Sequence, residues 1–435
     1  WMKRVAPSVS SVHIAFFDDR HLFMRRHVIP LLLFGLASPA LAQIGLSPVG
    51  DVVGQAMERL GRAVGDIAPL DPPDLLHFAT QLAQDRVNRL TAFIRENRTM
   101  VERDDLGQPA RRGVVLILDS DPTTLETARR LGFTVSGADA FGNLGLSATQ
   151  LSVPDGMALP RALAVLRKAL PERTVTADPL HFTSGAVGSP RAGGRSPPAS
   201  QPINTRVGII DGGIAPSLKP IAVRGFATGA PAPSDHGTAV ASLLRRAGVT
   251  NILSADVYGR GPAGGNALAI VRAMDWMAGE KVPVISISLV GPRNPLMERA
   301  ITAIAKRGVI ITAAVGNDGP AAPPAFPASY SPVIAVTGVD GRNRALIEAG
   351  RALHLDYAAP GADMKALDGK GVEHSVRGTS FAAPLVAARA AAALDRGEGS
   401  ESVRAVLNSE ARDLGRKGPD QVYGRGLLCG ACRSP

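Results

Sequence analysis

The stretch Arg377-Gly-Thr-Ser-Phe-Ala-Ala-Pro384 opens an alanine-rich run that continues to about residue 394. Alanine is the strongest helix former, so the run predicts a helix with Ser380 at or near its first turn. The unpaired N–H groups and the positive dipole end of a helix N-terminus favour negative charge that develops beside a hydroxyl. Ser380 is therefore a candidate nucleophile. A small residue that merely opens a packed helix is the alternative.

The chain around this stretch alternates between strand-like and helix-like patterns from residue 205 to residue 428. Apolar runs rich in Val and Ile predict buried strands at 207–210, 252–257, 282–289, 309–315 and 333–339. Helical patterns between these runs predict a mostly parallel sheet with helices on both faces, a three-layer α/β domain. Ligands of such folds bind beyond the carboxyl ends of the strands. Asp211 and Asn317 follow the first and fourth of these runs, so both are candidate site residues.

Four polar side chains of this domain together supply the groups that acyl transfer needs. A serine hydroxyl attacks a peptide only with an imidazole to take its proton, a carboxylate to orient the imidazole, and donors for the oxyanion. His236 lies in the stretch Asp-His-Gly-Thr-Ala-Val-Ala, and Asn317 lies in Ala-Ala-Val-Gly-Asn-Asp-Gly. Each of these residues alone has an ordinary structural explanation. With Asp211 and Ser380 they predict a nucleophilic hydrolase whose chain order is Asp, His, Ser.

Residues 205–428 resemble the subtilisin-like serine proteases, the subtilase family or peptidase family S8. The motifs that carry the resemblance are Ile-Ile-Asp-Gly-Gly-Ile, His-Gly-Thr-Ala-Val-Ala, Ala-Val-Gly-Asn-Asp-Gly-Pro and Gly-Thr-Ser-Phe-Ala-Ala-Pro. The resemblance implies that Asp211 orients His236, which is the general acid and base, while Ser380 attacks the substrate. It also implies that the Asn317 side chain and the Ser380 N–H form the oxyanion hole. The segment from Asp211 to His236 is compact and lacks an Asp-rich loop, so we do not expect the calcium site that many relatives carry. No other metal and no cofactor are expected.

Two features depart from the family's pattern. Gly212 stands where the family usually has Ser or Thr, which predicts that a local hydrogen bond is missing. The segment 286–290 resembles the family's substrate-binding strand, and Ser288, Leu289 and Val290, together with Gly316, are expected to line the primary pocket. Val290 replaces a usual glycine, so we expect a narrowed pocket that accepts small side chains such as Ala.

The segment 108–182 predicts a separate small domain. Its strand and helix patterns follow the order β-α-β-β-α-β, which is typical of a ferredoxin-like module. The resemblance implies that this module is a propeptide, which inhibits the enzyme until the linker is cut; an unrelated ferredoxin-like domain is the alternative. The linker 183–204 is small, polar and proline-rich, which predicts a flexible segment open to proteolysis. Residues 43–107 are expected to be mostly helical.

The two ends of the chain carry weaker signals. Residues 1–23 form an uncertain extension, and residues 24–42 have the basic, apolar and small-residue regions of a signal peptide. The apolar run is shorter than the roughly 20 residues of a membrane anchor, so export to the periplasm or the medium is expected, with no stable anchor after cleavage. In the tail 429–435, Cys429 and Cys432 predict a local disulfide or a loose end.

The charge of the chain suggests a further class of function. Lys and Arg number 48 against 38 Asp and Glu, a net charge of +10. These cations are scattered and aromatic residues make up only 4% of the chain, so we expect no nucleic-acid partner. The sequence thus predicts an exported serine endopeptidase that acts on polypeptides and is inhibited by its own propeptide. The alternatives are an inactive pseudoprotease that serves as a binding scaffold and a surface- or nucleic-acid-binding protein.

Overall fold

The structure is a computed structural model that describes residues 72–190 and 201–432. The expected extension (1–23), the signal peptide (24–42) and residues 43–71, 191–200 and 433–435 lie outside the described residues. None of the helices in the described part is long and apolar enough to cross a membrane.

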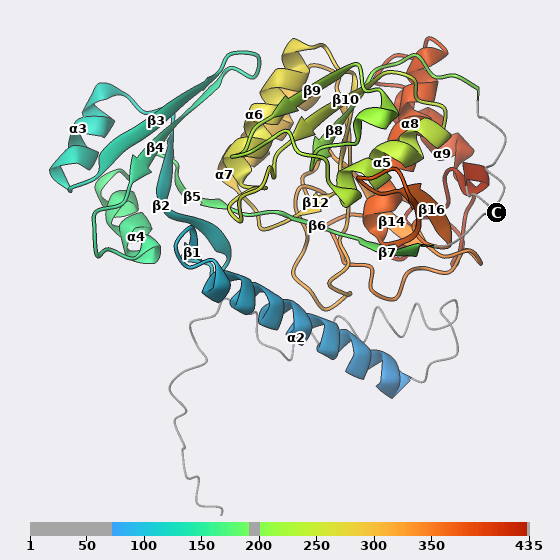
Figure 1. Cartoon of the computed structure of the whole chain (residues 1–435), viewed down its shortest axis with the longest axis horizontal. Helices are drawn as coiled ribbons and strands as arrows, with labels where there is room; N and C mark the ends of the chain where they lie inside the picture. Colours follow the sequence, from blue (N-terminus) through green and yellow to red (C-terminus); the bar gives the residue numbers. More distant parts are fainter. Residues whose placement is uncertain (1–71, 191–200, 433–435) are drawn as a thin grey trace, which may run out of the picture. The chain divides into compact units, whose positions relative to one another are not determined.

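Seven parallel strands form the central sheet of residues 201–432, in the order β15-β14-β13-β11-β8-β10-β9 (Figure 1). They are β8 (Val207–Asp211), β9 (Ala222–Gly225), β10 (Ile252–Asp256), β11 (Val284–Ile287), β13 (Ile310–Ala314), β14 (Ile334–Val339) and β15 (Tyr357–Pro360). The five predicted apolar runs lie on five of these strands, which confirms the α/β prediction. The edge strands β9 and β15 were not predicted, because Ala-Val-Arg-Gly and Tyr-Ala-Ala-Pro are too short and lack a run of branched residues.

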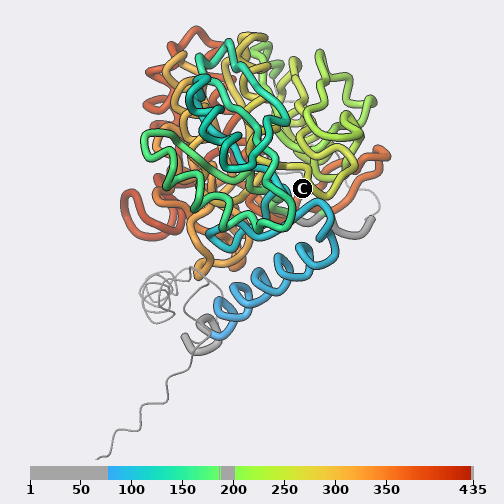
Figure 2. Tube along the Cα trace, turned by 90° about the vertical axis from the view of Figure 1, so that its left-hand side faces the viewer, coloured from blue at the N-terminus to red at the C-terminus, as the bar shows by residue number. Residues whose placement is uncertain are grey.

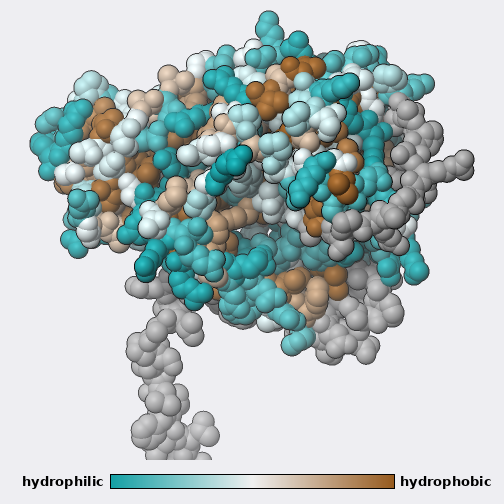
Figure 3. Space-filling model, in the orientation of Figure 1, coloured by the Kyte–Doolittle hydropathy of each residue, from teal (hydrophilic) through white to brown (hydrophobic). Residues whose placement is uncertain are grey.

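Helices cover both faces of this sheet, and each face has its own apolar core (Figure 1). One core contains side chains of α5 (Asp235–Arg246), α8 (Ala383–Asp395) and α9 (Val403–Glu410), and the other contains side chains of α6 (Ala267–Gly279) and α7 (Pro295–Ala305). Most side chains of α8 are buried alanines, which let its backbone approach the sheet closely. In Figure 3 the visible surface is mainly hydrophilic, with apolar side chains in small groups.

The segment that precedes the main sheet forms a second, smaller sheet with two helices. It contains β2 (Pro109–Leu118), α3 (Pro122–Arg130), β3 (Thr134–Phe141), β4 (Leu146–Ser152), α4 (Leu159–Ala169) and β5 (Val175–Pro179), so its order is β-α-β-β-α-β. The pairings are antiparallel and run β3-β4-β2-β5. Its core includes Leu159, Leu163 and Leu166, at the helical spacing seen in the sequence. We call residues 101–179 the N-terminal domain.

One long helix precedes this domain. It is α2 (Pro72–Glu96), the blue helix of Figure 2, and β1 (Val101–Arg103) follows it. The expectation of a mostly helical region up to residue 107 is therefore wrong at its end. β1 pairs with the start of β2, and the Glu102 carboxylate accepts a hydrogen bond from the Gly113 amide at 2.7 Å.

The first part of the expected linker is ordered, which corrects the prediction of a flexible segment from residue 183 onward. β6 (Phe182–Thr183) pairs antiparallel with β12 (Leu289–Val290), and β7 (Ala186–Pro190) pairs antiparallel with β17 (Glu373–Arg377). β17 in turn pairs with β16 (Met364–Leu367). Main-chain hydrogen bonds to these strands order a segment whose small side chains offer little apolar burial. At the other end of the chain, Cys429 and Cys432 form a disulfide.

Candidate active site

The four predicted site residues lie together at the carboxyl edge of the main sheet. Asp211 is the last residue of β8, and Asn317 follows the end of β13. His236 is in the first turn of α5, and Ser380 lies in a single turn of 3-10 helix, Thr379–Phe381, directly before α8. Ser380 is therefore in the turn that leads into the helix rather than in the helix itself. Gly378, which precedes it, has a φ of 142°.

The imidazole of His236 is oriented by the carboxylate of Asp211. The His236 Nδ1 atom lies 3.0 Å from both carboxylate oxygens of Asp211, which is fully buried. The Gly212 amide donates a further hydrogen bond to Asp211 Oδ1 at 2.7 Å. A carboxylate bonded to Nδ1 holds the tautomer whose Nε2 atom is free to accept a proton. Among the described residues, Nε2 of His236 is buried and has no hydrogen-bond partner.

The glycine at position 212 fits tightly against Ser234. A Cβ atom added to Gly212 would lie 2.3 Å from the Ser234 hydroxyl oxygen, so a side chain there would displace Ser234. Ser234 is the N-cap of α5, where its hydroxyl accepts a hydrogen bond from the Gly237 amide at 3.0 Å. Gly212 has no side chain to form the hydrogen bond that the family's Ser or Thr would make. The space that such a side chain would fill is taken by Ser234, which caps the helix that carries His236.

The carbonyl oxygen of Ser184 occupies the position where hydrogen-bond donors of the site converge. It accepts hydrogen bonds from the Ser380 amide at 3.2 Å and from the side-chain amide of Asn317. The Asn317 Oδ1 atom accepts from the Thr379 amide at 3.0 Å, which turns its NH₂ group toward Ser184. The Ser380 hydroxyl is also hydrogen-bonded to this carbonyl oxygen, and the two serine hydroxyl oxygens lie 2.6 Å apart.

The segment 182–190 passes through the site as a peptide would. Thr183 pairs with Leu289 and Phe182 pairs with Val290, so the expected substrate-binding strand already carries an antiparallel partner. Ser184 then presents its carbonyl to the donors, and β7 continues along β17. No local pattern predicts this path, because residues 182–190 have neither an apolar period nor a turn signature.

The four residues expected to line the primary pocket differ from one another in what they contact. The hydroxyl of Ser288 donates to the Ser380 carbonyl at 2.8 Å, and the Leu289 side chain is buried in the core. Val290 lies beside Gly316: a Cβ atom added to Gly316 would be 3.3 Å from Val290 Cγ1. Thr379 fixes Gly316, because its hydroxyl is 3.1 Å from both the amide nitrogen and the carbonyl oxygen of Gly316.

Comparison with known proteins identifies the family. The subtilase family model matches residues 204–426, about half of the chain. The chain belongs to the subtilase family. It is 33% identical over 247 residues to subtilisin DY of Bacillus licheniformis, a match that covers 52% of this chain and 89% of that protein. Subtilisin E of Bacillus subtilis (strain 168) is 30% identical over 247 residues, which cover 52% of this chain and 64% of that protein.

A solved structure supports the fold. The crystal structure of fervidolysin from Fervidobacterium pennivorans, a keratinolytic enzyme related to subtilisin, matches with a TM-score of 0.61 and 17% identity. The match covers 74% of this chain and 61% of that one. The solved structure supports the fold, whereas the family match and the subtilisin relatives confirm the resemblance inferred from the motifs: this subtilase is a subtilisin-like serine endopeptidase.

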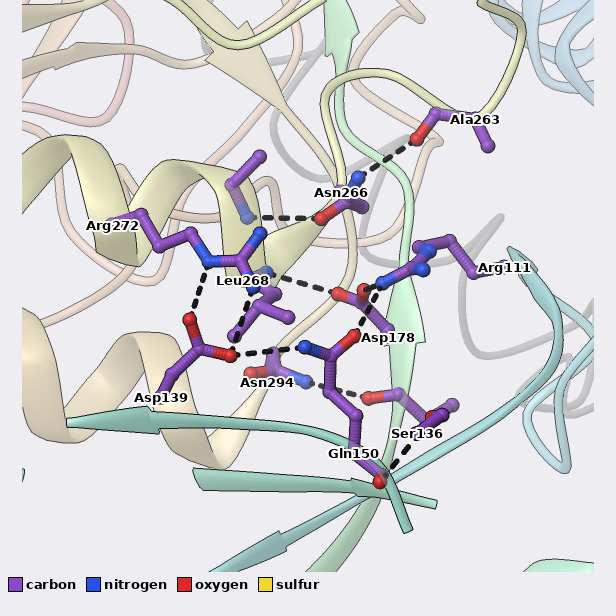
Figure 4. Close-up of polar contacts among 12 residues, drawn as sticks. Arg111, Ser136, Asp139, Gln150, Asp178, Ala263, Asn266, Leu268, Arg272 and Asn294 are labelled. Carbon is purple, nitrogen blue, oxygen red and sulfur yellow. Dashed lines mark hydrogen bonds and ion pairs between the residues drawn. The ribbon is translucent and has the colours of Figure 1, made fainter. Parts of the chain in front are cut away.

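The N-terminal domain contacts the subtilase domain through a polar network beside α6 (Figure 4). Asp178 is fully buried; it accepts from the Leu268 amide at 2.9 Å and from Arg111 at 3.1 Å. Burial raises the pKa of Asp178, and Arg111 opposes that rise. Arg272 of α6 donates two hydrogen bonds to Asp139 of β3, at 2.6 and 2.9 Å. The bonds of Leu268 and Arg272 cross between the two domains, so they tie β5 and β3 to α6.

Helix α2 makes further contacts close to the oxyanion donors. Arg86 and Arg89 of α2 both bind the carboxylate of Asp318, the neighbour of Asn317, at 3.0 and 2.5 Å. Phe93 of α2 packs edge-on against Phe182, with 5.2 Å between the ring centroids. The helix α2 therefore holds both the Asn317 loop and the segment that enters the site.

The residue that precedes Phe182 is a histidine with a buried ring. His181 has no exposed surface, and both of its ring nitrogens lack hydrogen-bond partners among the described residues. Burial lowers the pKa of His181 to about 4. Its backbone is well held: the amide donates to Gly265 and the carbonyl accepts from the Tyr258 hydroxyl, each at 2.8 Å.

Proposed function

We propose that this subtilase hydrolyses peptide bonds with Ser380 as nucleophile, His236 as general acid and base, and Asp211 as the group that orients His236. The Asn317 side chain and the Ser380 amide stabilise the oxyanion. The observation that carries this proposal is the convergence of these two donors on one carbonyl oxygen, to which the Ser380 hydroxyl is also hydrogen-bonded. Preorganised donors at the position of the developing oxyanion are commonly the largest contribution to acyl-transfer catalysis.

We further propose that the enzyme is made as a self-inhibited precursor and cuts its own chain between Ser184 and Gly185. The N-terminal domain and α2 are the inhibitory propeptide, and their contacts hold residues 182–184 in the site. Export through the signal peptide, to the periplasm or the medium, precedes the activity on other polypeptides.

The cut follows from the contacts of Ser184. The Ser380 hydroxyl turns from the Ser184 oxygen to the unpartnered Nε2 of His236, gives it the proton, and adds its oxygen to the Ser184 carbonyl carbon. The bond to the Gly185 nitrogen then breaks, and His236 gives the proton to that nitrogen. Water, deprotonated by His236, hydrolyses the Ser184 ester and regenerates the Ser380 hydroxyl.

The proposal is tested by expressing residues 43–435 beside the Ser380→Ala variant. We expect the wild type to yield two fragments, with a new amino terminus at Gly185, and to react with a fluorophosphonate; the variant should remain intact and unlabelled. Equal fragmentation of both proteins would refute self-cleavage. An intact and unlabelled wild type would instead favour an inactive scaffold.

A further inference from the structure

Gly185, the residue on the far side of the proposed cut, has no room for a side chain. A Cβ atom added to Gly185 would lie 2.8 Å from Phe381 Cε2, 3.1 Å from Phe381 Cζ and 3.2 Å from Ser380 Cβ. Carbon atoms that are not bonded to each other pack favourably at about 3.5–4.0 Å, so all three of these contacts are too short. We propose that Phe381 makes this subtilase selective for peptide bonds that are followed by glycine. This inference rests on the proposed function and adds a substrate class to it.

The Phe381 ring has little freedom to move away from such a side chain. It has no exposed surface and belongs to the apolar core that includes α8. Its centroid lies 5.5 Å from that of the His236 ring, and His236 is held by Asp211. Because interiors are close-packed, a shift of Phe381 would disturb either the core or the imidazole. A larger residue after the cut therefore raises the barrier of the reaction instead of being accommodated.

The backbone of Gly378 also lies close to Gly185. A Cβ atom at Gly378 would lie 2.8 Å from Gly185 Cα, 3.0 Å from the Ser184 carbonyl oxygen and 2.6 Å from Asn317 Nδ2. With its φ of 142°, this position also disfavours any other residue. The substrate main chain thus passes between Gly378 and Phe381 through a slot that fits a backbone alone. The preferred substrates are extended peptides in which a small residue precedes the cut and glycine follows it.

The selectivity is measured with peptides that copy residues 181–190 and are incubated with the self-processed enzyme. One peptide keeps the glycine that corresponds to Gly185, and a second carries alanine there. A third keeps that glycine and carries alanine at the position of Gly188, which controls for the loss of a flexible glycine from the same segment. We expect kcat/KM for the second peptide to be at least about tenfold lower than for the first, the penalty of an overpacked contact, while the third stays close to the first.

A change in the enzyme separates the role of Phe381 from a general preference for flexible peptides. In Phe381→Leu the slot widens, so the ratio of kcat/KM between the glycine and alanine peptides should fall toward one, whatever the absolute rates. The wild-type ratio alone decides the selectivity if this variant does not fold. Equal cleavage of the glycine and alanine peptides by the wild type would overturn the inference and leave the proposed function standing. Failure to cleave any peptide, with no self-cleavage, would overturn both.

Discussion

Protonation of His181 should open the segment that fills the active site. The ring is fully buried, and its pKa falls from the ordinary 6.5 to about 4 because burial disfavours the charged form. A lowered histidine pKa means that the closed segment keeps its full stability above pH 6.5 and loses it as the pH falls toward 4. The full separation of the two pKa values corresponds to about 3.4 kcal/mol of opening free energy, or a change of roughly 300-fold in the open population.

Hydrogen exchange of the uncut Ser380→Ala protein measures this opening directly. The His181 amide, bonded to the Gly265 carbonyl at 2.8 Å, exchanges only when the segment opens. Between pH 7.5 and pH 4, corrected for the intrinsic exchange rate, its opening free energy should fall by about 3 kcal/mol relative to a Ser380→Ala/His181→Phe control. Asp178 opposes the effect in both proteins, because its raised pKa favours the closed form as the pH falls. An identical pH dependence in the two proteins would refute the role of His181.

Two further substitutions test contacts that support the site. Asp318→Asn removes the charge that Arg86 and Arg89 bind, so it should raise the protease sensitivity of α2 in the Ser380→Ala protein and weaken its docking by about 1 kcal/mol; unchanged digestion would contradict the role given to this ion pair. Ser234→Ala removes the N-cap of α5 and should lower the free energy of unfolding by about 1 kcal/mol in urea titration, with an unchanged midpoint as the contrary result.

Strands and helix ends could be predicted from the sequence wherever a short stretch carries the whole pattern. The apolar run before Asp211 predicts a buried strand, because strands of a parallel sheet are covered on both faces and are therefore apolar along their whole length. The motifs around His236 and Ser380 indicate their positions in the fold, since strand and helix ends follow from the same pattern. The structure brings these residues together with Asn317, and their catalytic roles remain a proposal.

The segment 182–190, which fills the site, is held by contacts that no local sequence pattern predicts. Ser184 and Gly185 are small residues in a stretch whose composition is typical of a flexible linker. They are ordered by pairing with strands that follow more than 100 residues later in the chain. The lack of space at Gly212 likewise depends on a residue distant in the sequence, Ser234. The burial of His181 comes from the loops that contain Gly265 and Gly291. Strand pairing over such separations is set by the tertiary fold.

The strands β12 and β17 contact the segment 182–190 mainly through main-chain groups, which every residue carries. A protein that is to be cut must therefore present an extended stretch on both sides of a suitable glycine, with its own N–H and C=O groups unpaired. Folded proteins satisfy nearly all of these groups internally, whereas denatured chains, tails and long loops do not. The rate of cutting would then report how often a target unfolds locally, and well-folded neighbours would survive beside damaged ones.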